Sequence, residues 1–123
     1  MTPKELYERI GGDYDAALKI LMNDALIGRF IVKIPEDTSC PNLLKAAETL
    51  DPAGMFEASH AMKGVYANLG LTNLSAAASV ITEEFRPGSQ RRMSDEAVQE
   101  KVAEIKEMYH TAITAIDEFK KEQ

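Results

Sequence analysis

The sequence has a single cysteine, Cys40, and no run of apolar residues that approaches the roughly 20 needed to span a bilayer. One cysteine cannot form an internal disulfide, which argues against a secreted domain stabilised by such bonds. The first residues, Met1 to Glu5, also lack the basic and then apolar pattern of a secretory signal. We therefore expect a protein that works in the cytoplasm and does not enter a membrane.

Positive charge is scarce as well. Lysine and arginine number 14 against 20 aspartate and glutamate residues, which gives a formal net charge of −6 at pH 7. A nucleic-acid-binding protein usually needs a basic face to neutralise phosphates, so we expect protein partners instead. The 123 residues contain no internal repeat and no Gly/Ser/Pro-rich linker. Residues 1–123 should therefore form one domain with one core and one functional site.

No segment shows the alternation of apolar and polar residues that is typical of strands, whereas apolar residues recur at helical spacing through most of the chain. Short connections between amphipathic helices favour antiparallel neighbours. The predicted fold is all-α, an antiparallel four-helix bundle with one or two short extra helices at the N-terminus. The pattern predicts a helix over 2–11, a long helix from 13 to about 33, a loop over 35–42 that contains Cys40, and helices over 43–50, 52–69, 72–85 and 94–119.

The central helix has two different faces. At about 100° per residue, one face collects an apolar stripe that should be buried: Met55, Ala58, Ser59, Met62, Val65, Tyr66 and Leu69. His60, Gly64 and Ala67 lie on the opposite face, with Phe56 and Lys63 beside them. Small side chains around an exposed imidazole suit close contact with another protein. Because Gly64 costs about 1 kcal/mol relative to alanine inside a helix, we predict that a larger side chain there would crowd His60.

The run from His60 to Gly64, followed by Asn68-Leu69-Gly70-Leu71 and then by Leu74, resembles the histidine-containing phosphotransfer (HPt) domain. That family's pattern is Ala-His-x-Leu-Lys-Gly, then a Leu-Gly pair, then a leucine on the next helix. The order and spacing agree throughout, and the length of the chain is that of a free-standing HPt protein.

Four positions depart from the family pattern. Ser59 stands in place of alanine, Met62 in place of leucine, and Ile81-Thr82 in place of a Leu-Glu pair. Most of these changes should affect packing only, and we expect loss of the glutamate to alter local pairing. None of them removes a chemical group that phosphoryl transfer requires.

The resemblance implies that His60 accepts a phosphoryl group from the aspartate of a response-regulator receiver domain and passes it to another receiver. An imidazole suits this relay, because a ring nitrogen without a proton is nucleophilic near pH 7. Lys63 would stabilise the phosphoryl group and Gly64 would leave room for it, while Phe56, Ala67 and Asn68 would contact the partner. Asn68 is equally well explained as a residue that helps to end its helix.

The same resemblance defines what the protein should not supply. We expect a monomer without a cofactor of its own, because a divalent metal, Mg²⁺, would come with the receiver. Receivers and a hybrid histidine kinase are the expected partners. The sequence has no Gly-rich nucleotide-binding segment and no room for an ATP-binding domain, so we expect no kinase activity.

Two other interpretations are compatible with parts of the sequence. The first is a helical adaptor that binds receivers or kinases without transferring phosphate. The second is a metal site, because Glu57/His60 and Glu107/His110 both read Glu-x-x-His, as in di-iron helical bundles. Such ligands must point inward, whereas these four lie roughly 140–220° from the apolar stripes of their helices. We therefore expect no metal site.

Overall fold

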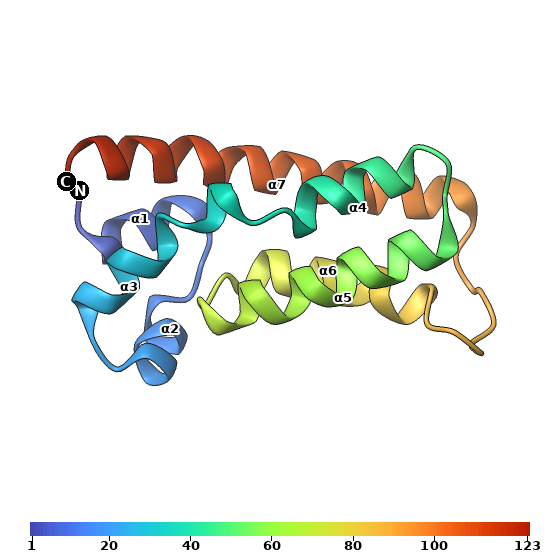
Figure 1. The fold of residues 1–123 in the computed structure, drawn as a ribbon, viewed down its shortest axis with the longest axis horizontal. Coiled ribbons are helices and arrows are strands. Elements are labelled where there is room, and N and C mark those ends of the chain that lie inside the picture. Colours follow the sequence, from blue (N-terminus) through green and yellow to red (C-terminus); the bar gives the residue numbers. More distant parts are fainter.

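The computed structural model describes residues 1–123 and consists of helices and their connections. Four helices run side by side, and consecutive ones point in opposite directions, so that the predicted all-α antiparallel bundle is confirmed (Figure 1). None of the helices combines the length and apolar character needed to cross a membrane. The elements are α1 (Pro3–Ile10), α2 (Tyr14–Leu21), α3 (Asp24–Ile31), a 3₁₀ turn η1 (Ile34–Glu36), α4 (Ser39–Ala47), α5 (Pro52–Asn68), α6 (Thr72–Glu84) and α7 (Asp95–Lys121).

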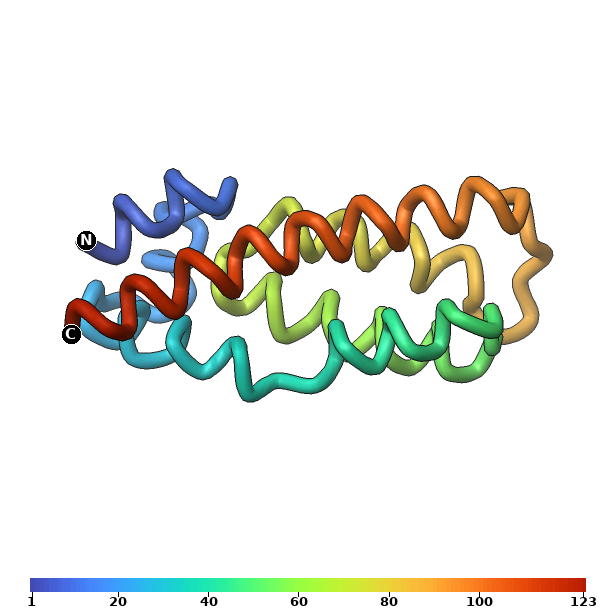
Figure 2. Tube along the Cα trace, turned by 90° about the horizontal axis from the view of Figure 1, so that it is seen from above, coloured from blue at the N-terminus to red at the C-terminus, as the bar shows by residue number.

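A single core joins these helices. It contains 28 buried hydrophobic residues, and every helix contributes at least one of them. Helix α7 runs the length of the molecule, with α1, α4 and α6 packed against it (Figure 2). Helix α5 packs against α4 and α6. The predicted apolar stripe of α5 is buried, apart from Val65, which is half-buried. The opposite face of α5 is thereby fixed as an outer surface.

The expected long helix over residues 13–33 is wrong, because the chain breaks between α2 and α3. Met22 has a positive φ of 68°, and the side chain of Asn23 accepts a hydrogen bond from the Leu26 N–H and so begins the next helix. Three short helices, α1 to α3, therefore precede the bundle. Apolar residues continue at helical spacing across the break, which hides it from a reading of periodicity.

The expected loop over residues 35–42 is also wrong. Residues Ile34–Glu36 form a 3₁₀ turn, and α4 begins already at Ser39, whose backbone N–H and side-chain hydroxyl both donate to the Asp37 carboxylate. Cys40 is consequently a fully buried helix residue. An aspartate just before a helix favours its start, both as a hydrogen-bond acceptor and as a negative charge near the positive end of the helix.

The segment before α2 holds the turn between α5 and α6 in place. The Tyr7 hydroxyl donates to the Leu69 carbonyl oxygen (2.5 Å), and the Asp13 N–H donates to the Gly70 carbonyl oxygen (2.7 Å). On the other side of the turn, the Asn73 side chain donates to the carbonyl oxygen of Ile10 (3.2 Å). The N-terminal helices therefore fix the end of the helix that carries His60.

A buried carboxylate, that of Glu84, fixes the connection between α6 and α7 at the other end of the bundle. Glu84, only 7% exposed, accepts hydrogen bonds from the N–H groups of Arg92 and Met93 and from the Arg91 guanidinium (3.0 Å). Burial alone would raise the pKa of Glu84, but these hydrogen bonds outweigh it and hold the pKa below its usual value. Glu84 thus stabilises the connection in its charged form.

We expect Glu84→Gln to lower the free energy of unfolding at pH 7 by about 1–3 kcal/mol, because hydrogen bonds to a charged acceptor are lost. Since the folded-state pKa is depressed, the stabilisation is present above the unfolded-state pKa of about 4.3 and is lost as the pH falls through the folded-state pKa. The difference between wild type and variant should therefore shrink below about pH 4 in urea titrations. Glu100→Gln, an exposed change on α7, serves as control, and an equal effect of both substitutions would contradict the role of Glu84.

Candidate functional site

The structure places His60 on the outer surface of α5, as the helical spacing predicts. His60, Gly64, Ala67 and Asn68 are all exposed, and Lys63 is half-exposed beside them. The Asn68 side chain sits in the last turn of α5. These residues share one open face and do not line a cavity.

Phe56 connects His60 to a residue that the sequence analysis did not single out. The Phe56 and His60 rings are stacked, with centroids 5.5 Å apart and planes inclined by 8°. The Arg86 guanidinium lies 5.5 Å from the centroid of the same Phe56 ring. Half-buried Phe56 therefore contacts both a potential phosphoryl acceptor and a cation.

Glu83 brings a negative charge to the same place. Its carboxylate accepts two hydrogen bonds from Arg86, from Nη2 (2.8 Å) and from Nε (3.0 Å). The hydrogen bond from Arg86 holds the pKa of Glu83 below its usual value, and the charges of Arg86, Lys63 and His60 act in the same direction. Sequence spacing does not reveal Glu83 and Arg86, because they lie at and just beyond the end of α6 and come close to the Phe56–His60 pair only in the folded chain.

The departures from the HPt pattern at positions 59 and 82 meet behind the histidine. Thr82 Oγ1 lies 2.9 Å from Ser59 Oγ and 3.0 Å from the Ala78 carbonyl oxygen. Ser59 Oγ in turn lies 3.2 Å from the Phe56 carbonyl oxygen. Both hydroxyl groups are fully buried and satisfied. The serine and the threonine therefore form one contact between α5 and α6 and leave the outer face unchanged.

Gly64 does not relieve crowding within the chain itself. A Cβ atom built at this position would meet no atom within 4 Å, including the His60 ring. The prediction that a larger side chain would crowd His60 is therefore wrong for alanine in the free protein. The empty space above Gly64 lies outside the molecule, where an approaching group would use it.

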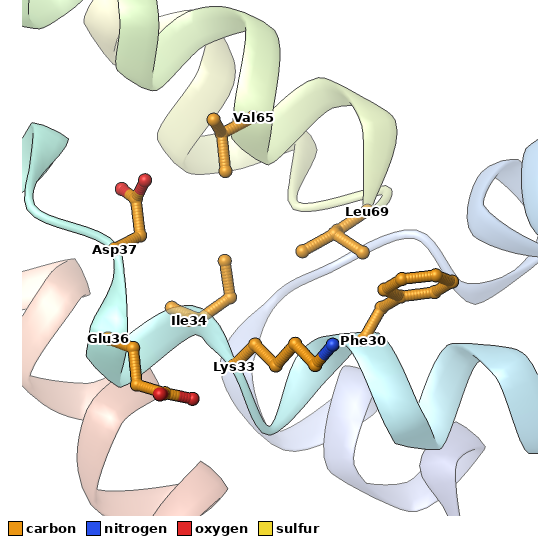
Figure 3. Close-up of a pocket in the computed structure, with 7 residues that line it drawn as sticks. All are labelled: Phe30, Lys33, Ile34, Glu36, Asp37, Val65 and Leu69. Atoms are coloured by element: carbon orange, nitrogen blue, oxygen red, sulfur yellow. The ribbon is translucent and has the colours of Figure 1, made fainter.

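A partly apolar cleft of the surface lies away from His60. A cleft of about 460 Å³ separates the α3–η1 segment from the C-terminal half of α5 (Figure 3). It is lined by Phe30, Lys33, Ile34, Glu36, Asp37, Val65 and Leu69. None of the predicted site residues lines it. His60 therefore lies on the exposed face of α5 and outside this cleft.

The alternative metal interpretation finds no support in the arrangement of side chains. Glu57, Glu107 and His110 are exposed, as is His60, and the two Glu-x-x-His pairs lie on the outer faces of α5 and α7. Nowhere do three or more histidine, cysteine, aspartate or glutamate side chains come together as they would around a metal ion.

Comparison with known families agrees with this geometry. The family model of the Hpt domain matches residues 25–115, which include the whole of α4, α5 and α6 and most of α7. The chain belongs to the Hpt domain family. Proteins of this class transfer phosphoryl groups through histidine in two-component and phosphorelay signalling, where they interact with receiver domains and histidine kinases, and they are generally not kinases themselves. No curated protein and no solved structure matches the chain.

Proposed function

We propose that this protein is a phosphorelay intermediate that accepts a phosphoryl group on His60 from the aspartate of one receiver domain and passes it to another. The observation that supports this proposal is the exposed imidazole on the face of α5 that Gly64 leaves open. The second histidine, His110, is also exposed, but Ile113 and Thr114 follow it where Lys63 and Gly64 follow His60.

The reaction needs little from this chain beyond a nucleophile and positive charge. The ring nitrogen without a proton supplies the electron pair for the new N–P bond, the P–O bond of the acyl phosphate breaks, and its electron pair remains on the receiver's carboxylate. The other ring nitrogen keeps its proton. Lys63 forms no ion pair within the chain, so its ammonium group is available for the phosphoryl oxygens. Mg²⁺ would be supplied by the receiver.

The docking surface includes the exposed residues further along α5. Ala67 is small, and the Asn68 side chain forms no hydrogen bond within the chain, which favours a contact with the partner over a role in ending the helix. Phe56 is half-buried against His60, so we assign it less to docking and more to holding the imidazole.

The experiment that tests this function is incubation with phosphorylated receivers of the source organism. We expect phosphate on His60 that is labile in acid and stable in base, located by mass spectrometry. A chain that binds receivers but gains no phosphate would instead be the non-transferring adaptor. The same survey, carried out across all receivers, identifies the donor and the acceptor.

We expect Gly64→Ala to stabilise the protein and to slow phosphate uptake. Alanine favours a helix by about 1 kcal/mol over glycine, and its methyl group meets nothing in the free chain. The same methyl group would stand in the space through which the phosphoryl group and the receiver approach. Urea unfolding and initial rates of transfer measure the two effects separately.

The matched control is Ala103→Gly, an exposed substitution within α7 that should destabilise by a similar amount without altering transfer. If Gly64→Ala transferred phosphate at the wild-type rate, Gly64 would have no role in clearance.

A further inference from the structure

The guanidinium that lies against the Phe56 ring already has a carboxylate partner. Arg86 lies against Phe56, yet its guanidinium donates two hydrogen bonds to Glu83 in a bidentate pair. The pair is exposed, with side-chain exposures of 40% for Arg86 and 58% for Glu83. Surface ion pairs of this kind contribute little to stability, so the fold does not explain why a carboxylate stands beside the site.

Phosphorylation would change the balance of charge around this pair. The pair consists of Glu83 of α6 and Arg86 of the following connection, and the ionisable groups near it are Lys63 and His60 of α5. A phosphoryl group adds a charge of about −1.5 to −2 together with strong acceptor oxygens. Glu83 would then repel a second anion. Arg86, which lies against the ring that stacks on His60, would be attracted by two anionic groups and not by one.

We propose that Glu83 is a positioning residue that competes with the phosphoryl group of His60 for Arg86. Glu83 keeps Arg86 in an ion pair and repels the phosphoryl group. It thereby makes phosphorylated His60 less stable and favours transfer of the phosphoryl group to the receiver. The inference rests on the proposed function of His60. In this proposal, Glu83 helps to set the equilibrium distribution of the phosphoryl group between His60 and the receiver's aspartate.

The test is the equilibrium distribution of phosphate between the chain and one receiver, measured for wild type, Glu83→Gln, Arg86→Gln and the double variant. Loss of Glu83 should shift the distribution roughly three- to tenfold toward His60, the range expected for one charge interaction near a protein surface. Loss of Arg86 should shift it toward the receiver. Because Glu83 acts through Arg86, replacing Glu83 should have a clearly smaller effect when Arg86 is already absent.

Glu100→Gln, which removes an equal charge from the exposed surface of α7, is the control for net charge. An unchanged distribution in Glu83→Gln, or a shift equal to that of the Glu100 control, overturns the inference while uptake by the wild type upholds the proposed function. An undiminished effect of Glu83→Gln in the absence of Arg86 overturns the competition for Arg86. Absence of phosphate on wild-type His60 overturns both proposals.

Discussion

Replacing His60 with glutamine is expected to reduce phosphate uptake from a phosphorylated receiver to background. Glutamine is polar and similar in length, but its amide has no nucleophilic nitrogen to form the N–P bond. The substitution lies on an exposed helix face, so the free energy of unfolding should change by no more than about 0.5 kcal/mol. Intact-mass measurement after incubation, with and without acid treatment, reports the transferred phosphate directly.

His110→Gln is the matched control, because His110 is the other histidine of the chain and is also exposed on a helix. This variant should accept phosphate at the wild-type rate. Equal uptake by wild type and His60→Gln, or a loss of uptake in His110→Gln, would disprove the assignment of His60 as the acceptor.

Replacing Gly70 with alanine is expected to destabilise the fold by about 3 kcal/mol or more, the largest effect on stability that we predict. Gly70 has a φ of 71°, where a side chain is strained. A Cβ atom there would also lie 2.5 Å from the Asp13 carbonyl oxygen and 2.9 Å from the Ala17 backbone nitrogen, so the N-terminal segment would have to move. Urea unfolding followed by circular dichroism measures the loss.

Gly88→Ala separates the two causes. Gly88 has a similar φ of 86°, but a Cβ atom at this position would meet nothing within 4 Å. Its replacement should therefore cost only the backbone strain, about 1–2 kcal/mol. An equal cost at Gly70 and Gly88 would contradict the close packing of the N-terminal segment against the turn.

Local signals in the sequence were sufficient to predict most of the helices. Thr2 and Glu5 form a capping box, Asp13 and Ser94 cap their helices, and Gly11 ends α1 in the left-handed conformation. The same reasoning placed His60 outward on α5, since that inference needs only the apolar stripe on the opposite face.

Features that depend on contacts between distant segments could not be predicted in this way. The pairing of Ser59 with Thr82 and the approach of Arg86 to Phe56 join residues that are more than 20 positions apart. The break at Met22 was missed for a related reason, because an uninterrupted apolar pattern carries no sign of a positive φ. The buried hydroxyl pair behind His60 and the charged side chains beside it can therefore be identified only from the folded structure.

The single cysteine, Cys40, can be used to measure how often the helical bundle opens. The thiol is fully buried in α4, which packs against α5, and burial raises its pKa to about 12. Because the thiolate is the reactive form, a thiol reagent should modify the native chain only when this part of the bundle opens. The labelling rate of the single cysteine therefore reports how often the bundle exposes α4, with no added probe and at a distance from the phosphate chemistry.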